Sequence, residues 1–158
     1  MRTFQLASVA ALFAIASAVS PASLAQAPAE IVMVAADELK WADFPALPPG
    51  AKVAVIQGPP NEAKPYIVRL KFPANYKVPV HTHPGTEHLT VISGTFHLGT
   101  GGKLDQNQTK ALIPGSVALI QPNIKHFAWT NSETVVQLHG MGPSAIAYPN
   151  PADDPRKN

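Results

Sequence analysis

The sequence predicts an all-β domain, a sandwich or a barrel, and three observations support this fold class. From residue 52 onward, apolar residues recur with a period of two, as in strands that bury one face. Turn-forming residues separate these stretches at intervals of about 8–12 residues, which is typical of sandwiches and barrels. Segments with a helical period are almost absent. The chain has 158 residues, a length that favours a single domain.

The first predicted strands precede and follow a proline. A short strand is expected over 52–57. A longer one is expected over 66–72, in which every second residue is apolar and the others are mostly polar. Pro73 lacks the N–H that a strand ladder needs, so the longer strand should end there. The next strand is predicted over 78–83, after a turn.

The second half of the domain continues as short strands separated by turns and one loop. The glycine-rich loop over 99–110 lacks the Gly-Lys-Ser/Thr sequence of a phosphate-binding loop, and no helical pattern follows it. The remaining strands are predicted over 87–92, 95–99, 115–120, 126–129, 133–140 and 144–148.

The first 25 residues have the pattern of a secretory signal peptide. A basic residue, Arg2, precedes an apolar run over 6–19, and small residues at 23 and 25 suit a cleavage site. The apolar run is shorter than the ~20 residues that a membrane-spanning helix needs. We therefore expect cleavage after Ala25, export to the periplasm or the extracellular space, and no stable membrane anchor.

Two further segments flank the predicted barrel. An alanine- and proline-rich amino-terminal arm covers 26–50, with a helical turn at 36–41, and a polar tail that we expect to fray covers 149–158. The chain contains no cysteine, which excludes disulfides, a catalytic thiolate and zinc–thiolate sites. The formal net charge is only +2, so we expect no nucleic-acid partner.

A group of residues suited to metal binding begins where the third predicted strand ends. His81 and His83 are two residues apart, so both point to the same face of an extended strand. After a turn, Glu87 lies on the inward face of the next strand, where a buried carboxylate needs a partner. Imidazole nitrogens and carboxylate oxygens are ligands that borderline divalent metals accept. The sequence therefore predicts a metal site.

This stretch resembles the first motif of the cupin superfamily, which is commonly written G-x5-H-x-H-x3,4-E-x6-G. The matching residues are His81, His83, Glu87 and Gly94. Asn75 stands in place of the leading glycine. Asparagine tolerates the left-handed backbone conformation that such a turn can require, so this departure leaves the resemblance intact.

The second cupin motif, commonly written G-x5-P-x-G-x2-H-x3-N, is matched in part. Gly115 and His126 keep the expected separation. Between them, the proline is shifted by one position to Pro122, and Asn123 replaces the glycine. Thr130 occupies the position of the final asparagine. We therefore expect the histidine ligand to be retained and the turn before it to be shaped differently.

The resemblance implies a double-stranded β-helix, a jelly-roll-like barrel, over residues 51–148. Because members of the family commonly form dimers, it also suggests a homodimer. It also implies that one divalent transition metal is held inside this barrel by four side chains, His81, His83, Glu87 and His126. Iron, manganese, nickel, copper and zinc all remain compatible with these ligands. Such a set does not fill an octahedron, so positions stay open for water, O₂ or a substrate oxygen.

The other histidines have simpler interpretations. His88 and His97 alternate away from inward-facing residues, so both are expected on the outer surface. Two interpretations stay open for His139 and Gln137, which share a strand face. They face outward, or, if that polar face is the inner one, they contact the metal ligands or a substrate. Two aromatic residues are expected to pack outside the barrel lumen, Phe127 and Trp129.

Two functions are compatible with this set of features. The first is a metal-dependent enzyme of the dioxygenase type that acts on a small oxygen-rich molecule, as the resemblance suggests. The second is a non-catalytic cupin that binds or senses a metal or a small ligand. A serine hydrolase is disfavoured because the chain has no Gly-x-Ser-x-Gly elbow.

Overall fold

The computed structural model describes residues 31–157. The chain divides into two units, residues 1–32 and 33–158, and the fold below is that of the second unit. The signal peptide predicted over 1–25 lies outside the described residues. The described strands are β1 (Ala42–Asp43), β2 (Lys52–Gln57), β3 (Pro65–Phe72), β4 (Lys77–His81), β5 (Glu87–Ser93), β6 (Phe96–Thr100), β7 (Lys110–Leu112), β8 (Val117–Ile120), β9 (His126–Thr130) and β10 (Thr134–Met141). Four short 3₁₀ turns complete the described elements, η1 (Ala36–Glu38), η2 (Gln106–Gln108), η3 (Pro151–Asp153) and η4 (Pro155–Lys157).

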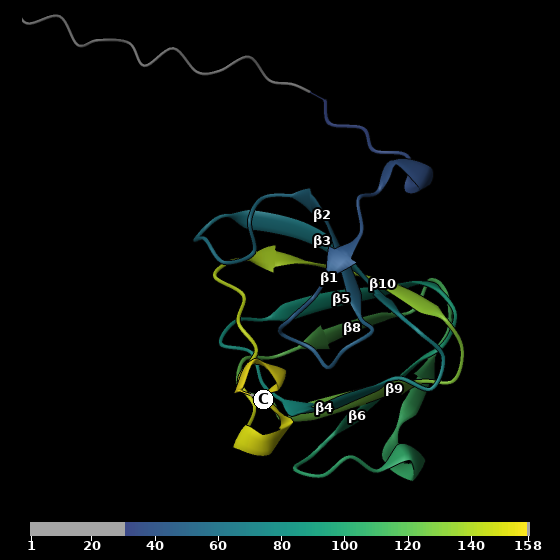
Figure 1. The fold of residues 1–158 in the computed structure, drawn as a ribbon, viewed down its shortest axis with the longest axis vertical. Coiled ribbons are helices and arrows are strands. Elements are labelled where there is room, and N and C mark those ends of the chain that lie inside the picture. Colours follow the sequence, from purple (N-terminus) through teal and green to yellow (C-terminus); the bar gives the residue numbers. More distant parts are fainter. Residues whose placement is uncertain (1–30, 158) are drawn as a thin grey trace, which may run out of the picture. The chain divides into compact units, whose positions relative to one another are not determined.

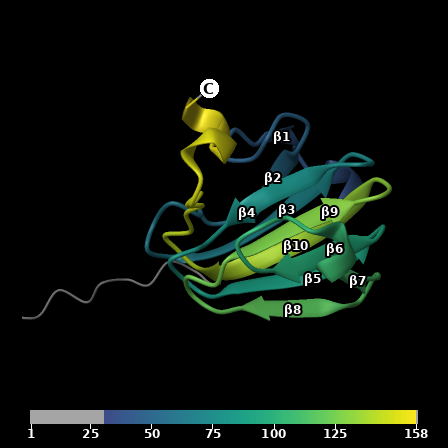
Figure 2. The ribbon, with the colours of Figure 1, turned by 90° about the horizontal axis from the view of Figure 1, so that it is seen from below.

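The strands form two antiparallel sheets that face each other. One sheet has the order β1-β2-β3-β10-β5-β8, and the other has the order β4-β9-β6-β7. Figure 1 shows the two sheets as two layers, with β4, β9 and β6 opposite β3, β10, β5 and β8, and in Figure 2, seen from below, the strands of the two sheets overlie one another. The all-β prediction is confirmed. Strand neighbours that are distant in sequence, such as β3 and β10, bring the two halves of the chain into one sheet.

The hydrophobic core lies between the two sheets. The alternation in β3 is confirmed, because its inward residues are buried and line or join the core. The ring of Phe72 lies 5.4 Å from that of Tyr76 and 5.6 Å from that of Phe96, so aromatic packing joins β3 to the opposite sheet. Val136 of β10 is fully buried in the same cluster.

The predicted strands differ from the observed ones in two places within the barrel, at β7 and at 144–148. β7 pairs with β6 but was missed, because three residues are too short to show an alternating pattern. The strand predicted over 144–148 is wrong, since the only ladder contact there is a bridge between Ala147 and Thr82. Its alternation has another cause: Ile146 packs against the core, and the Tyr148 hydroxyl donates to the Ala46 carbonyl at 2.7 Å. Side chains anchored on one face imitate a strand pattern without a strand.

The two asparagines that stand at glycine positions of the cupin motifs both adopt the left-handed conformation. Asn75 has φ 61° and Asn123 has φ 62°. These are the non-glycine residues with positive φ among those described. Asparagine adopts this region more readily than most residues, so both turns keep the backbone that glycine would provide. The expectation that Asn75 adopts this conformation is confirmed, whereas the turn at Asn123 was expected to be shaped differently and instead keeps a left-handed φ.

We expect Asn123→Ala to destabilise the protein by about 1 kcal/mol, because alanine is strained in the left-handed region, whereas Asn123→Gly should change stability by only a few tenths. Urea unfolding of the two metal-free variants would measure this difference. Equal stabilities would show that the turn relaxes into another conformation.

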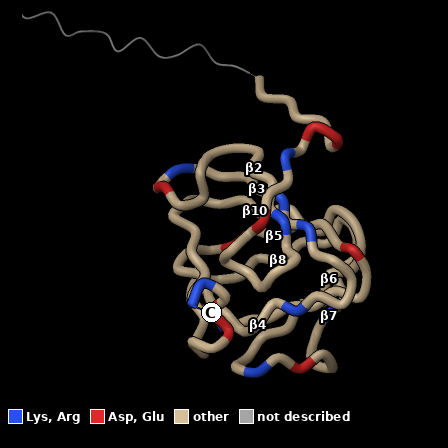
Figure 3. Tube along the Cα trace, viewed as in Figure 1, with Lys and Arg blue, Asp and Glu red and all other residues tan. Residues whose placement is uncertain are grey.

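The tail does not fray as predicted. Asp154 is buried, and its carboxylate forms a paired contact with Arg156, with Nε to Oδ1 at 2.7 Å and Nη2 to Oδ2 at 2.9 Å. The guanidinium also donates to the Ile146 carbonyl at 3.0 Å, which ties the tail to the chain beside the cavity. Figure 3 shows acidic and basic residues side by side at this end of the chain. A polar composition suggested fraying, but a bidentate ion pair orders the segment. Within the described part of the chain, no helix has the length and apolarity to cross a bilayer.

Candidate metal centre

The predicted ligands lie where strands of the two sheets begin or end. His81 is the last residue of β4 and His126 is the first residue of β9, and the two are paired directly across the ladder. His83 follows Thr82, whose N–H and carbonyl pair with Ala147. Glu87 is the first residue of β5, in the other sheet. The opening between the sheets therefore holds all four side chains.

The three imidazoles gather around one point. One ring nitrogen of each lies within 4.8 Å of those of the other two, and all three side chains are buried. The ring of His81 is 4.1 Å from that of His126 and 4.9 Å from that of His83. These three histidines can hold a metal ion. Glu87 lies outside this group, but its Oε2 is 3.1 Å from Nε2 of His83.

Backbone carbonyls set the tautomer of each imidazole. His81 Nδ1 contacts the Pro79 carbonyl at 2.7 Å, and His126 Nδ1 contacts the Ile124 carbonyl at 2.9 Å. His83 Nδ1 contacts the Ala145 carbonyl at 2.8 Å. A carbonyl only accepts hydrogen bonds, so each Nδ1 carries the proton and donates. The Nε2 atoms are therefore unprotonated in the neutral rings and free to bind a metal.

Burial keeps the imidazoles neutral. It lowers the pKa of His81 to about 3, with further lowering from His126 and His83 nearby. Burial also lowers the pKa of His83 and the pKa of His126. For Glu87, burial acts in the opposite direction and raises the pKa of the carboxyl group to about 7. The cluster therefore carries little positive charge of its own near neutral pH.

An unsatisfied contact at the centre shows that these residues fit a cation. His83 Nε2 is buried and has no hydrogen-bond partner among the described residues, yet it lies 3.1 Å from the Glu87 carboxylate. With the ring proton on Nδ1, an ionised Glu87 would place two acceptors against each other. A proton on Glu87 or a cation between the two groups removes this conflict. The donor set of nitrogens and an oxygen suits a borderline divalent metal.

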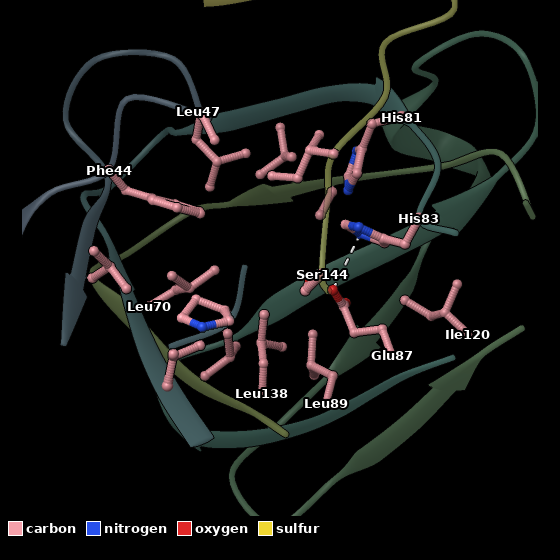
Figure 4. Close-up of a pocket in the computed structure, with 18 of the residues that line it drawn as sticks. Phe44, Leu47, Leu70, His81, His83, Glu87, Leu89, Ile120, Leu138 and Ser144 are labelled. Atoms are coloured by element: carbon pink, nitrogen blue, oxygen red, sulfur yellow. Dashed lines mark ion pairs between the residues drawn. The ribbon is translucent and has the colours of Figure 1, made fainter. Parts of the chain in front are cut away.

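A cavity of about 300 Å³ extends from the histidines into the space between the sheets. Figure 4 shows His81, His83, Glu87 and Ser144 together on one side of this cavity, with Phe44, Leu47 and Leu70 on the opposite side. Most of the lining is apolar and comes from both sheets. This volume is at the lower end for small-molecule sites. The metal ligands therefore face a space in which a small ligand can reach them.

The remaining histidines lie on outer faces. His88 and His139 are cross-strand partners with rings stacked at 4.9 Å, and His97 stacks on Trp129 at 3.8 Å. The interpretation that placed His139 and Gln137 inside is wrong. Their neighbours Val136 and Leu138 line the cavity, so the polar face of β10 points outward.

The other outer-face contacts agree with this assignment. Gln137 accepts a hydrogen bond from Arg69 Nε at 3.1 Å on that face. The Trp129 indole donates to Thr109 at 3.2 Å, and Phe127 is fully buried beneath Gly99. Neither aromatic residue lines the cavity. The prediction that Phe127 and Trp129 pack outside the barrel lumen is confirmed.

Sequence reasoning missed two hydroxyl residues beside Glu87. Tyr66 of β3 is buried and lines the cavity, and Tyr66 and Ser144 both lie beside Glu87. Burial raises the pKa of Tyr66, so its hydroxyl stays protonated. The alternation over 66–72 predicts only that Tyr66 is one of the buried residues of its strand. The pattern over 144–148 predicts only an ordinary strand around Ser144. Nothing local to either residue marks it as part of the site.

The tail also bears on the site, because Arg156 in the tail donates to the carbonyl of Ile146, and the neighbouring carbonyl of Ala145 orients His83. We expect Asp154→Asn to weaken metal binding by about tenfold, since the tail would lose its ion pair and Ala145 would hold His83 less firmly. Metal titration with a competing chelator would measure this. Lys52→Gln, which removes the exposed pair between Lys52 and Asp43, is the matched control and should leave the affinity unchanged.

Comparison with known proteins gives structural neighbours only. No family model and no curated protein matches the sequence. The structure is similar to the polyketide cyclase RemF from Streptomyces resistomycificus, with a TM-score of 0.65 and 16% identity, covering 81% of this chain and 92% of that one. It is also similar to a putative acetylacetone dioxygenase from Methylibium petroleiphilum, with a TM-score of 0.61 and 17% identity, covering 82% and 88% of the two chains.

A third neighbour is an RmlC-like cupin from Shewanella frigidimarina, with a TM-score of 0.55 and 17% identity, covering 70% of this chain and 89% of that one. Likenesses at 16–17% identity establish a fold and leave the activity open. Together with the two facing antiparallel sheets, they show that this protein is a double-stranded β-helix of the cupin type.

Proposed function

We propose that the protein is an exported metalloenzyme of the dioxygenase type that acts on a small molecule bearing oxygen ligands. The observation that carries this proposal is the set of three buried imidazoles whose Nδ1 atoms are all engaged by carbonyls, which leaves their Nε2 atoms for one ion. Glu87 would be the fourth ligand. Export is supported by the signal-peptide pattern over 1–25.

The surrounding residues suit chemistry that needs a dry site. A bound divalent metal would polarise the oxygens of a substrate and, if redox-active, would activate O₂. The apolar walls exclude water, and the Tyr66 and Ser144 hydroxyls can donate hydrogen bonds to a substrate oxygen beside Glu87. One structural neighbour is named as a putative acetylacetone dioxygenase, which supports the reaction type, and another as a polyketide cyclase, which supports a small-molecule substrate only.

The test begins with the full chain purified without a histidine tag, followed by metal analysis. Protein loaded with Fe²⁺ should then consume oxygen with an enolic, phenolic or diketone compound. His126→Ala should abolish this activity, whereas His88→Ala, on the outer face, should retain it. Failure to retain any metal would overturn the proposal. A protein that holds metal tightly and consumes no oxygen would be the binding or sensing cupin instead.

A further inference from the structure

The cavity has one polar end and one apolar end, and this polarity constrains what can occupy it. Building on the proposed metal function, we propose that the ligand has a two-oxygen head, which reaches the metal, and an apolar body of an alkyl chain or a single aromatic ring. Sugars and other polyhydroxylated molecules are excluded. The prediction of an oxygen-rich molecule is thereby narrowed to one whose oxygens are confined to one end.

The side chains at the apolar end of the cavity provide no hydrogen-bond partner for a ligand hydroxyl group. Phe44, Leu47 and Leu70 lie across the cavity from the histidines in Figure 4, and Val53 and Leu138 also line it. A ligand hydroxyl against these side chains would leave water without gaining a hydrogen bond, which is costly. A methylene or an aromatic ring there would instead gain from burial.

The segment that carries Phe44 and Leu47 is held in place. The Tyr148 hydroxyl donates to the Ala46 carbonyl at 2.7 Å, and the Tyr76 hydroxyl donates to the Pro48 carbonyl. Leu47 is itself buried in the core cluster. The apolar end is therefore part of the folded wall.

Hydrogen-bonding groups gather at the opposite end. The Tyr66 and Ser144 hydroxyls lie beside Glu87, and the three imidazoles are at the same end. Asn61 and Arg156 also line the cavity, but both are exposed, which places them where it meets the surface. The Arg156 guanidinium is already engaged by Asp154 and Ile146. The interior therefore provides polar partners for a ligand head only.

Hydroxamates with one shared bidentate head and different bodies test this directly. We would titrate the Zn²⁺-loaded full chain with acetohydroxamate, hexanohydroxamate and gluconohydroxamate by calorimetry. Each buried methylene should tighten binding by about fourfold, so hexanohydroxamate should bind on the order of a hundredfold more tightly than acetohydroxamate. Gluconohydroxamate, with a six-carbon body bearing hydroxyls, should bind no more tightly than acetohydroxamate. Equal affinities for all three, or a preference for gluconohydroxamate, would overturn the inference.

A wall variant locates the body within the cavity. Val53→Phe fills the apolar end. It should remove most of the affinity that hexanohydroxamate gains over acetohydroxamate, while the affinity for acetohydroxamate stays unchanged. Val117→Phe, at an exposed position of β8, is the matched control and should change neither affinity. If hexanohydroxamate still binds much more tightly than acetohydroxamate to Val53→Phe, the apolar body does not lie at this end of the cavity.

A second arm separates failure of the inference from failure of the metal proposal. Absence of acetohydroxamate binding to Zn²⁺-loaded protein would count against the metal function. Metal-free protein still tests the apolar body, because toluene should raise its melting temperature and glucose should not. A shift with toluene supports the inference, and no shift with toluene overturns it.

Discussion

Replacing His126 with alanine should lower the affinity for a divalent metal by at least about a hundredfold, because the site would lose one of the three imidazoles that cluster among the described residues. The ring of His126 is almost fully buried and lies 4.1 Å from that of His81, so no other described side chain can take its place. Titration of Zn²⁺ against a chelator of known affinity would measure the loss.

His88→Ala provides the matched control for this prediction. His88 is adjacent to Glu87 in sequence, but its ring stacks on His139 on the outer face of the sheet. Its removal should leave the metal affinity within about twofold of the unchanged protein. If His88→Ala and His126→Ala weaken binding alike, the clustered histidines are not the metal site.

Metal binding should weaken by a factor on the order of fifty as the pH falls from 7 to 5, because the metal must displace a proton from Glu87. Burial raises the pKa of Glu87 to about 7, so its carboxyl group is protonated at pH 5 and half ionised near pH 7. Burial lowers the pKa values of the three histidines, which reduces the number of protons that they take up as the pH falls. Affinity should therefore fall about sixfold between pH 7 and pH 6 and about ninefold between pH 6 and pH 5.

Glu87→Gln isolates this effect, since glutamine has no proton to lose. Its metal affinity should be lower than that of the unchanged protein at pH 7 and nearly constant between pH 5 and pH 7. Calorimetry in two buffers of different ionisation enthalpy should show release of about one proton per ion at pH 6, and almost none in the variant. A steep pH dependence that persists in Glu87→Gln would assign the proton to another group.

Local patterns were enough to predict much of this fold. β3, the strand with the clearest alternation, was predicted closely because one of its faces is buried along its length. His81 and His83 were placed on one face by their spacing alone. Errors arose where a pattern had a different origin, as in 144–148, where side chains are anchored without a ladder.

The sequence by itself determined the fold class, the facing of the histidine pair and the turn at Asn75, because each depends on residues within a few positions of one another. Only the tertiary structure decided which face of β10 points inward, and so excluded His139 from the site. It also decided that the carbonyl of Ala145 orients His83 from 62 positions away, and that the cavity is polar at one end only. These features depend on which distant segments pack together, and alternation within one strand carries no information about its partners.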